Sequence, residues 1–207
     1  MAEVALYTPD KRIRFTLPSP AEDEAIAKLR TDPINRRFLR FLPESVSAAQ
    51  VAHFRETRSK DPRNLDFVIS YLDDEGNYQF SGVCNVFLID ETHLWGDAGI
   101  WISSDRQGQG LTTPIMYLLL EHVIEQRGLH RISFQTGIDN APMRGWLEKA
   151  AGIRNEGQFK NCWKEPAGGW LDVMSYGVTA DEWVDRVKPT LQKKMKERGV
   201  GLPKEEA

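Results

Sequence analysis

Residues 96–126 read GDAGIWISSDRQGQGLTTPIMYLLLEHVIEQ and pass from a strand-like run through a glycine turn (residues 105–110) into a strongly helical segment. The turn contains Gly108 and Gly110, and glycine both adopts positive φ and lets other groups approach its backbone closely. The start of the following helix presents unpaired N–H groups and the positive end of the helix dipole at the same place. This segment therefore predicts a backbone cradle for phosphate.

Two common nucleotide-binding loops do not match this turn. A Walker-type loop ends in Gly-Lys-Ser or Gly-Lys-Thr because its lysine reaches the terminal phosphates, whereas Leu111 follows Gly110 here. A dinucleotide-binding turn needs a third glycine or alanine where Thr113 stands, after a strand of a parallel unit rather than a meander. Kinase, GTPase and dinucleotide-enzyme functions are therefore disfavoured.

On both sides of this segment, short β-branched or aromatic runs alternate with longer helical periods, which indicates a mixed α/β domain. We expect strands at residues 12–17, 65–72, 78–89, 94–102, 131–136, 153–164 and 170–178. We expect helices at residues 21–30, 47–60, 111–126, 140–150 and from 179 onward. The strands within residues 65–102 predict an antiparallel meander.

The C-terminal segment carries a charged pattern. Thr179 and Glu182 form a capping-box pair that begins a terminal helix, and the dipeptide 188–189, Lys-Pro, predicts a break in it. We expect one domain over residues 1–183 and a charged helix or tail over 184–207, frayed from residue 193. The tail has seven Lys or Arg against four Asp or Glu, which is too small an excess to indicate contact with RNA.

Composition limits the function further. Of 207 residues, 41% are apolar and 28% charged, so the chain is expected to fold into a compact core. A net charge of -3 argues against a general nucleic-acid binder. No signal-peptide or membrane-spanning run occurs, and Cys84 and Cys162 have no cysteine or histidine at metal-ligand spacing. We expect a cytoplasmic protein with two reduced thiols, no metal, no membrane and no nucleic-acid partner.

The order of these elements, the glycine turn and residues 140–157 resemble the GCN5-related N-acetyltransferase (GNAT) superfamily, in particular its RimJ/RimL-like branch. The resemblance extends from about residue 12 to residue 183. Its most specific parts are residues 96–102 before the turn, Asn140, residues 148–153 with Glu156 and Gly157, residues 170–172 with Tyr176, and residues 182–183.

The resemblance implies a GNAT-like domain in which helices flank a central, mostly antiparallel sheet of six to seven strands. It also implies direct transfer of an acetyl group from acetyl-CoA to a primary amine of a small molecule, peptide or protein, by a monomer or homodimer. In that family, backbone N–H groups of the turn hold the CoA diphosphate, and the preceding strand pairs with the pantetheine arm. The cofactor-binding residues so implied are Ile100, Trp101, Ile102, Gln107, Gly108, Gln109, Gly110, Leu111, Thr112 and Asn140.

Asp97 is the candidate general base, because it matches a position that is frequently acidic in this branch and precedes the cofactor turn. The alternative interpretation is an aspartate in a strand-edge hydrogen bond. Glu91 and His93 in the preceding turn are lesser candidates for the same role, and His93 also fits a solvated loop residue.

The general acid of the family has no obvious counterpart. Met143 stands where the branch often has a serine, and Trp146 and Leu147 stand where others have a tyrosine. Either another hydroxyl serves, with Tyr176 a weak catalytic candidate, or the thiol takes its proton from solvent or from the amine. This gap keeps open a second hypothesis, a non-catalytic acyl-CoA sensor. A different nucleotide enzyme that uses the turn is a third.

Two further features have competing interpretations. Cys162 has no histidine at a readable position, which favours direct transfer over an acyl-enzyme. The basic residues Arg36, Arg37 and Arg40 fall in the region that lines the acceptor cleft in this family. They are suited either to attract an acidic substrate or to form a solvated helix face.

Overall fold

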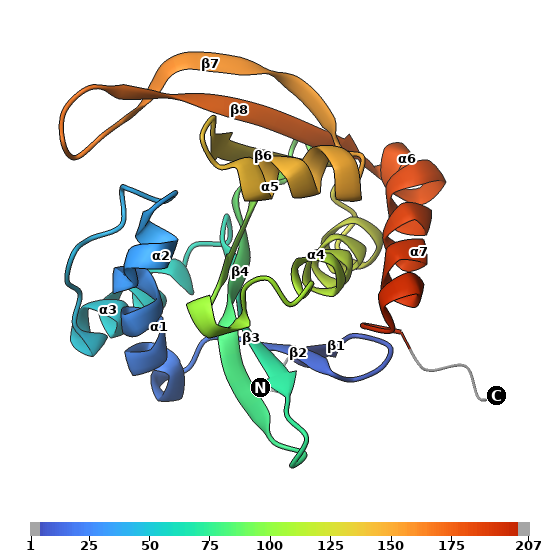
Figure 1. The fold of residues 1–207 in the computed structure, drawn as a ribbon, viewed down its shortest axis with the longest axis horizontal. Coiled ribbons are helices and arrows are strands. Elements are labelled where there is room, and N and C mark those ends of the chain that lie inside the picture. The colour runs from blue at the N-terminus through green and yellow to red at the C-terminus, as the bar shows by residue number, and fades with distance from the viewer. Residues whose placement is uncertain (1–4, 203–207) are drawn as a thin grey trace.

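A computed structural model describes residues 5–202, which form one eight-stranded sheet with helices on both faces (Figure 1). The strands are β1 (Ala5–Tyr7), β2 (Ile13–Thr16), β3 (Leu65–Leu72), β4 (Tyr78–Asp90), β5 (Trp95–Ile102), β6 (Arg131–Gly137), β7 (Arg154–Lys164) and β8 (Trp170–Thr179). Their order across the sheet is β1-β2-β3-β4-β5-β6-β8-β7, and only the β5–β6 pair is parallel.

The predicted mixed, mostly antiparallel sheet is confirmed, and each predicted strand end lies within one residue of its place in the structure. The sheet has eight strands rather than six or seven, because Ala5–Tyr7 also pairs with β2. Three residues are too few to show a strand period in the sequence. The ladder to β2 makes this segment a strand.

Helices and helical turns connect the strands. The α-helices are α1 (Asp23–Thr31), α2 (Pro33–Arg36), α3 (Ala48–Arg58), α4 (Thr112–Leu120), α5 (Ala141–Gly145), α6 (Ala180–Glu182) and α7 (Lys188–Arg198). The 3-10 turns are η1 (Pro20–Glu22) and η2 (Ser104–Arg106), and the π-helical turns are η3 (Glu121–Gln126), η4 (Trp146–Ala150) and η5 (Trp183–Val187). The π-helical turns continue α4, α5 and α6, so the predicted helices 111–126 and 140–150 are confirmed.

Helix α2 was not expected, because the Asp-Pro pair at its start reads as a helix stop. Asp32 ends α1 and also begins α2, since its carboxylate accepts a hydrogen bond from the Ile34 N–H at 2.8 Å. Pro33 stands in the first turn, where a missing N–H costs nothing. Asp32 itself has φ of -58° and ψ of 120°, outside the helical range, so the same dipeptide ends one helix and begins the next.

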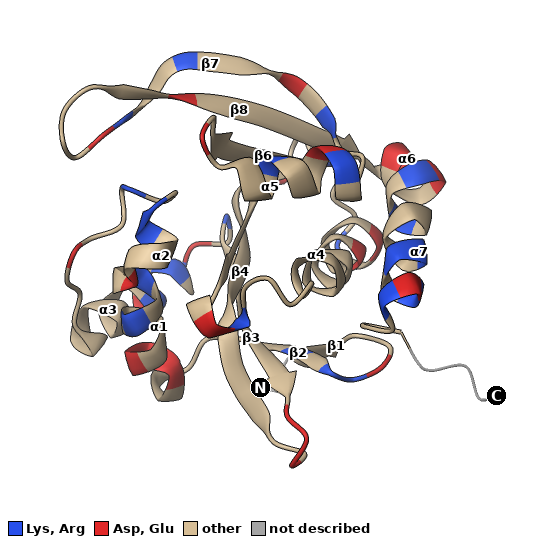
Figure 2. Ribbon diagram, viewed as in Figure 1, with Lys and Arg blue, Asp and Glu red and all other residues tan. Residues whose placement is uncertain are grey.

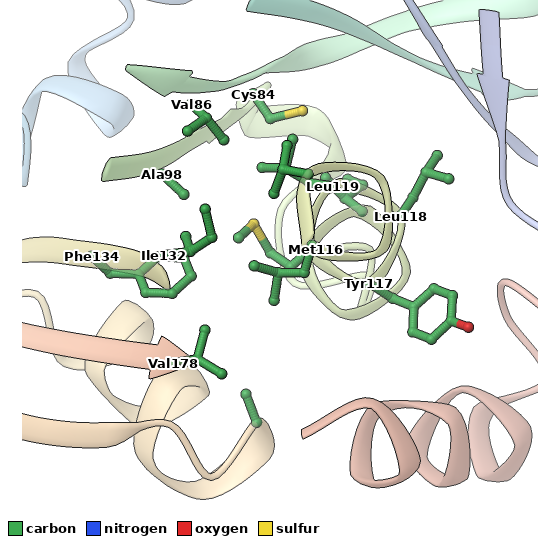
Figure 3. Packing of buried hydrophobic residues seen from close by; sticks show 14 of the residues in the cluster. Cys84, Val86, Ala98, Met116, Tyr117, Leu118, Leu119, Ile132, Phe134 and Val178 are labelled. Carbon is green, nitrogen blue, oxygen red and sulfur yellow. The ribbon is translucent and has the colours of Figure 1, made fainter. Parts of the chain in front are cut away.

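The main core lies between the sheet and α4, whose residues from Thr113 to Leu120 are all buried. Figure 3 shows side chains of this helix packed between strand residues and the C-terminal helix. The strand residues labelled there are Cys84, Val86, Ala98, Ile132, Phe134 and Val178. A smaller cluster of Ile26, Ala27, Val51 and Val68 lies under α1 and α3 on the opposite face. A buried helix on one face and an amphipathic pair on the other fix the orientation of every strand side chain.

The C-terminal segment is ordered further than the sequence predicts. The expected break at Lys188 does not occur, because Pro189 occupies the first turn of α7. The expected fraying from residue 193 is also wrong up to Arg198, since Leu191 and Met195, four residues apart, are buried in the main core. Residues 203–207 of the predicted tail lie outside the described residues.

The sheet divides between β5 and β6. These strands pair only through Trp95–Arg131, Gly96–Ile132 and Asp97–Ser133. Beyond this point β5 continues along β4 as far as Ile102, and β6 continues along β8 as far as Gly137. The facing edges of the two strands therefore diverge, and we call the resulting gap the splay.

Candidate active site

The splay offers free backbone along the second half of β5. Residues 98–102 keep their ladder with β4 but have no strand partner on the β6 side. Ile100 and Ile102 pack against the main core, while the Trp101 ring lies under the Arg30 guanidinium at 5.4 Å. The three predicted pantetheine contacts thus lie together on an unpaired strand edge, which an extended chain can occupy as an added strand.

The glycine turn lies directly after this edge. Gly108 and Gly110 have φ of 76° and 78°, so both use the freedom that the sequence predicts. No atom lies within 4 Å of the place where a Cβ on Gly108 would stand, which leaves that backbone open. Helix α4 then begins after Leu111 without a side-chain cap, so its first-turn N–H groups, including that of Thr112, have no side-chain acceptor. An anion fits this set of donors.

The two glutamines of the turn hold its shape through their side chains. Gln107 Nε2 donates to the Ile102 carbonyl and to Asn35 Oδ1 of α2, both at 2.9 Å. Gln109 Nε2 donates to the Asp105 carbonyl at 2.8 Å. The predicted turn residues are therefore brought together at the mouth of the splay, with their side chains committed to the protein.

Asn140 stands at the end of β6, across the splay from the turn, and caps α5. Its Oδ1 accepts from the Met143 N–H at 3.2 Å, and its Nδ2 donates to Thr136 Oγ1 at 2.9 Å. These bonds account for its presence without a ligand. Contact with the pantetheine or the acceptor remains a prediction for this side chain.

Asp97 is the last β5 residue that pairs with both neighbouring strands, so it marks the vertex of the splay. Its side chain lies on the sheet face opposite that of Ala98, which belongs to the α4 core. The residue is only 6% exposed, and no group of residues 5–202 donates a hydrogen bond to its carboxylate, whose oxygens still reach the surface. Burial raises the pKa of Asp97, and the charge of Arg131 opposes this only in part, since Arg131 pairs with Glu156 at 3.0 Å.

The strand-edge hydrogen bond that would explain Asp97 structurally is therefore missing from the described chain. A carboxylate with a raised pKa, placed where two strands separate, is better suited to accept a proton than an ordinary aspartate.

Tyr176 lies on the other face of the sheet. It is fully buried in the α4 core, and its hydroxyl donates to Glu148 at 2.6 Å. Burial and this hydrogen bond raise the pKa of Tyr176 above its ordinary value. The structure therefore does not bring Tyr176 and Asp97 to one side of the sheet. An acid role for Tyr176 stays a prediction that no contact supports.

Glu91 and His93 lie in the β4–β5 turn, at the closed end of β5, far along the strand from the glycine turn. Their turn is organised by Asp90, whose carboxylate accepts the Thr92 and His93 N–H groups at 2.8 and 2.9 Å. Neither side chain therefore belongs to the splay.

Arg40 joins three segments over the open end of the splay. It forms ion pairs with Asp139, which directly follows β6, and with Glu165 in the β7–β8 turn. Beside it, the Phe41 and Trp163 rings meet edge to face with their centroids 5.8 Å apart. We call these contacts of Arg40 and Phe41 the clasp. Figure 1 shows the β7–β8 hairpin reaching toward the helices α1–α3 at this place.

A cavity of about 260 Å³ lies under the clasp, lined by Arg36, Arg40, Glu165, Pro166 and Ala167. Charged residues gather on α1–α3 and on the C-terminal helices, whereas α4 carries none (Figure 2). The sequence pointed to the basic residues of this cavity, but it gave no sign of Asp139 or Glu165. These lie about a hundred residues away along the chain, and only the fold places them here.

Other kinds of site find no support in the part of the chain that the structure describes. Cys84 is buried, which raises the pKa of its thiol, and Cys162 is an exposed free thiol. Within residues 5–202, His, Cys, Asp and Glu side chains form no group of three or more that could hold a metal ion. None of the helices in that range has the length and apolar character needed to span a membrane.

Comparison with known proteins points to one family. The sequence profile of the family described as "Acetyltransferase (GNAT) domain" matches residues 12–152. YdaF of Bacillus subtilis (strain 168), provisionally named a ribosomal N-acetyltransferase, is 24% identical over 184 residues, which are 84% of this chain and 94% of that protein.

Solved structures agree in fold. RimJ of Mycobacterium smegmatis, in complex with CoA-disulfide, has a TM-score of 0.73 at 20% identity, with 93% of each chain covered. Spermidine N-acetyltransferase of Vibrio cholerae, in complex with CoA and spermine, has a TM-score of 0.73 at 17% identity, with 84% of this chain and 99% of that chain covered. The splay, the glycine turn and the matched profile lead to one assignment: this chain belongs to the GNAT family of acetyltransferases.

Proposed function

We propose that this protein is an acetyl-CoA-dependent N-acetyltransferase that transfers the acetyl group directly to a primary amine of a small molecule, peptide or protein. The observation that carries the proposal is the position of Asp97. A mostly buried carboxylate that receives no hydrogen bond from residues 5–202 stands at the vertex of the splay, in line with the unpaired edge of β5 and the glycine turn.

Acetyl-CoA supplies an activated thioester, and the chain offers it mainly backbone. The open backbone at Gly108 and the uncapped N–H groups at the start of α4 suit the diphosphate. The free edge of β5 suits the amide-bearing pantetheine arm, which pairs as a strand would. This assignment explains how a chain with a net charge of -3 accommodates an anionic cosubstrate.

Asp97 serves as the general base in this proposal. An amine attacks a thioester only when it is neutral, so an ammonium acceptor must first lose a proton. The raised pKa of Asp97 brings it closer to the pKa of the acceptor than an ordinary aspartate would be. An N–H group on the free edge of β5 is suited to stabilise the oxyanion that forms during attack.

Return of the proton to the departing thiolate needs no dedicated side chain. Met143 cannot donate one, and the Tyr176 hydroxyl is already bound to Glu148. We therefore propose that the proton comes from the attacking amine or from water.

The acceptor is left as a primary amine. The relatives named above bear names that point to ribosomal protein and to spermidine. Both carry amino groups, so neither name narrows the acceptor further than that.

A test of the proposal measures thiol release from acetyl-CoA with panels of peptides, polyamines and amino acids, and CoA binding in parallel. Release with at least one acceptor, lost in Asp97→Asn while CoA still binds, is the expected result. Tight CoA binding without release from any acceptor would instead establish the acyl-CoA sensor. Stronger thermal protection by ATP or NAD than by CoA would favour another nucleotide enzyme.

The structure offers one reason to prefer the enzyme over the sensor. Burial disfavours the charged form of a carboxylate, and it raises the pKa of Asp97 in this way. A protein that only binds acyl-CoA gains nothing from that arrangement.

A further inference from the structure

The end of the C-terminal helix lies against the glycine turn. If Gly110 carried a Cβ, that atom would stand 2.8 Å from Nη1 of Arg198 and 3.9 Å from its Cζ. The Arg198 guanidinium therefore occupies the space beside the second glycine of the turn. Two segments almost ninety residues apart in sequence meet at this point.

Arg198 is held there by a fixed chain end. Gly199 adopts the left-handed conformation, its N–H bonds to the Lys196 carbonyl, and the Val200 N–H bonds to the Met195 carbonyl, both at 3.1 Å. This is the Schellman pattern of helix termination. The helix end is therefore not frayed.

A second set of contacts fixes this end against α4. The Gly201 N–H donates to Asp10 Oδ2 at 2.6 Å, and a Cβ on Gly201 would stand 2.7 Å from Pro114 Cβ. Since Pro114 belongs to the first turn of α4, Arg198 is positioned relative to the same helix start that follows the glycine turn.

The charge of Arg198 is not used within the described protein. The side chain is exposed and forms no ion pair with residues 5–202, whereas Arg131 and Lys188 are paired with glutamates. The other cation at the turn, Arg106, approaches Asp105 at 3.6 Å. The turn thus has one unneutralised guanidinium beside its open backbone.

We propose that Arg198 binds the diphosphate of acetyl-CoA at the glycine turn, so that the C-terminal helix is a working part of the cosubstrate site. A guanidinium presents paired N–H donors that match phosphate oxygens in geometry and charge. Backbone amides hold the diphosphate from the turn, and Arg198 holds it from α7. This inference rests on the proposed function and adds a side chain from outside the segment, residues 12–152, that matches the family profile.

The experiment compares three ligands in direct binding to the full-length protein: CoA, dephospho-CoA without the 3′-phosphate, and pantetheine without any phosphate. In Arg198→Gln, the Kd for CoA and for dephospho-CoA should rise by about ten-fold, as for loss of a hydrogen bond to a charged group. The Kd for pantetheine should not change. Arg198→Lys should recover part of the loss, because it restores the charge without the paired donors.

Lys193→Gln is the matched control, since it removes the same charge from the same helix at a side chain that is 79% exposed and reaches Glu197 only at 4.0 Å. It should bind all three ligands as the wild type does. Equal CoA affinity in Arg198→Gln and wild type would overturn the inference, as would a loss seen with CoA but not with dephospho-CoA. If the wild-type protein bound no CoA, the proposed function itself would fail, which is a separate result.

Discussion

Gln107 of the glycine turn donates a hydrogen bond to Asn35 of α2, Nε2 to Oδ1, at 2.9 Å. Asn35 is 8% exposed, and its own Nδ2 donates to the Leu29 carbonyl of α1 at 3.2 Å. This one amide therefore couples the cofactor turn to the helices on the acceptor side. The two halves of the proposed reaction share a structural support.

Replacing Asn35 by leucine should weaken both the binding of CoA and the binding of the acceptor. The change leaves the Leu29 carbonyl without its side-chain donor and removes one of the two hydrogen bonds that Gln107 Nε2 donates, the other being to the Ile102 carbonyl. Losing these bonds costs roughly 1–3 kcal/mol of unfolding free energy. We expect higher Kd for CoA and higher KM for the acceptor, measured by calorimetry and initial rates. Gln109→Leu breaks a bond within the turn but none to α2, so it should raise the Kd for CoA and leave the acceptor KM alone.

Asp97→Asn should lower kcat by roughly a hundred-fold or more, the usual contribution of a positioned general base. The Kd for CoA should stay close to that of the wild type, because the proposed cradle does not involve this side chain. Initial rates across pH test the reason for the loss. The activity of the wild type should rise with pH as Asp97 ionises, and this rise should be absent from the pH–rate profile of the variant. Wild-type kcat in Asp97→Asn would remove Asp97 from the mechanism.

The same substitution should stabilise the protein at neutral pH. Burial raises the pKa of Asp97 in the folded state, so its contribution to stability is present below the unfolded pKa of about 3.9 and is lost as pH rises through the folded pKa. Asp97→Asn should therefore unfold at a higher temperature than the wild type at pH 7, and this difference should vanish in acid.

Asp90→Asn is the control of opposite sign. Hydrogen bonds from the His93 and Thr92 backbone lower the pKa of Asp90, so its contribution is present at neutral pH and is lost as pH falls. That variant should unfold at a lower temperature than the wild type at pH 7. If the unfolding temperature changed by the same amount and in the same direction in both variants, burial would not be the reason for the effect of Asp97→Asn.

Breaking the clasp should affect the acceptor and not the cosubstrate. Arg40→Gln removes the ion pairs to Asp139 and Glu165, and the KM for the acceptor should rise roughly five- to ten-fold, in keeping with loss of charge-assisted hydrogen bonds. The unfolding free energy should change by no more than about 1 kcal/mol, since these side chains are partly exposed. Arg63→Gln breaks the exposed Arg63–Asp61 pair elsewhere. It should change neither the KM for the acceptor nor the KM for acetyl-CoA. A parallel rise in the Kd for CoA would show that the clasp supports the whole site instead.

Cys162→Ala should keep the wild-type kcat, because direct transfer forms no acyl-enzyme. Cys162 is exposed on β7 and is not part of the splay. As a comparison, Cys84→Ala opens a hole in the main core and should lower stability by roughly 1–2 kcal/mol without abolishing turnover. Complete loss of activity in a folded Cys162→Ala protein would disprove direct transfer.

Local pattern accounts for most of what could be predicted from the sequence. The strands, the capping box at Thr179 and the positive-φ glycines of the turn depend on residues close to one another in the chain. The interactions that form these features join residues a few positions apart, so a local sequence pattern is enough to predict them. The free edge of β5 followed from the resemblance to the family rather than from spacing.

Long-range contacts could not be predicted in the same way. The partners of Arg40 and the approach of Arg198 to Gly110 join residues from distant parts of the chain. Helix α7 was underestimated because its two buried residues, Leu191 and Met195, are surrounded by lysines and arginines. Two apolar positions four residues apart are enough when α4 supplies the rest of the core.

The three residue pairs that join β5 to β6 have a mechanical consequence. The sheet consists of two parts, one of strands β1–β5 and one of strands β6, β8 and β7. They are joined only along the short β5–β6 seam, and α4 packs behind it. A chain that adds hydrogen bonds along the open part of this seam would lengthen the joint. In the proposed function the cosubstrate therefore also bridges the two parts of the sheet and helps to fix the angle between them. Binding and release of the cosubstrate in each turnover would then form and break hydrogen bonds along this seam, next to the place where the chemistry occurs.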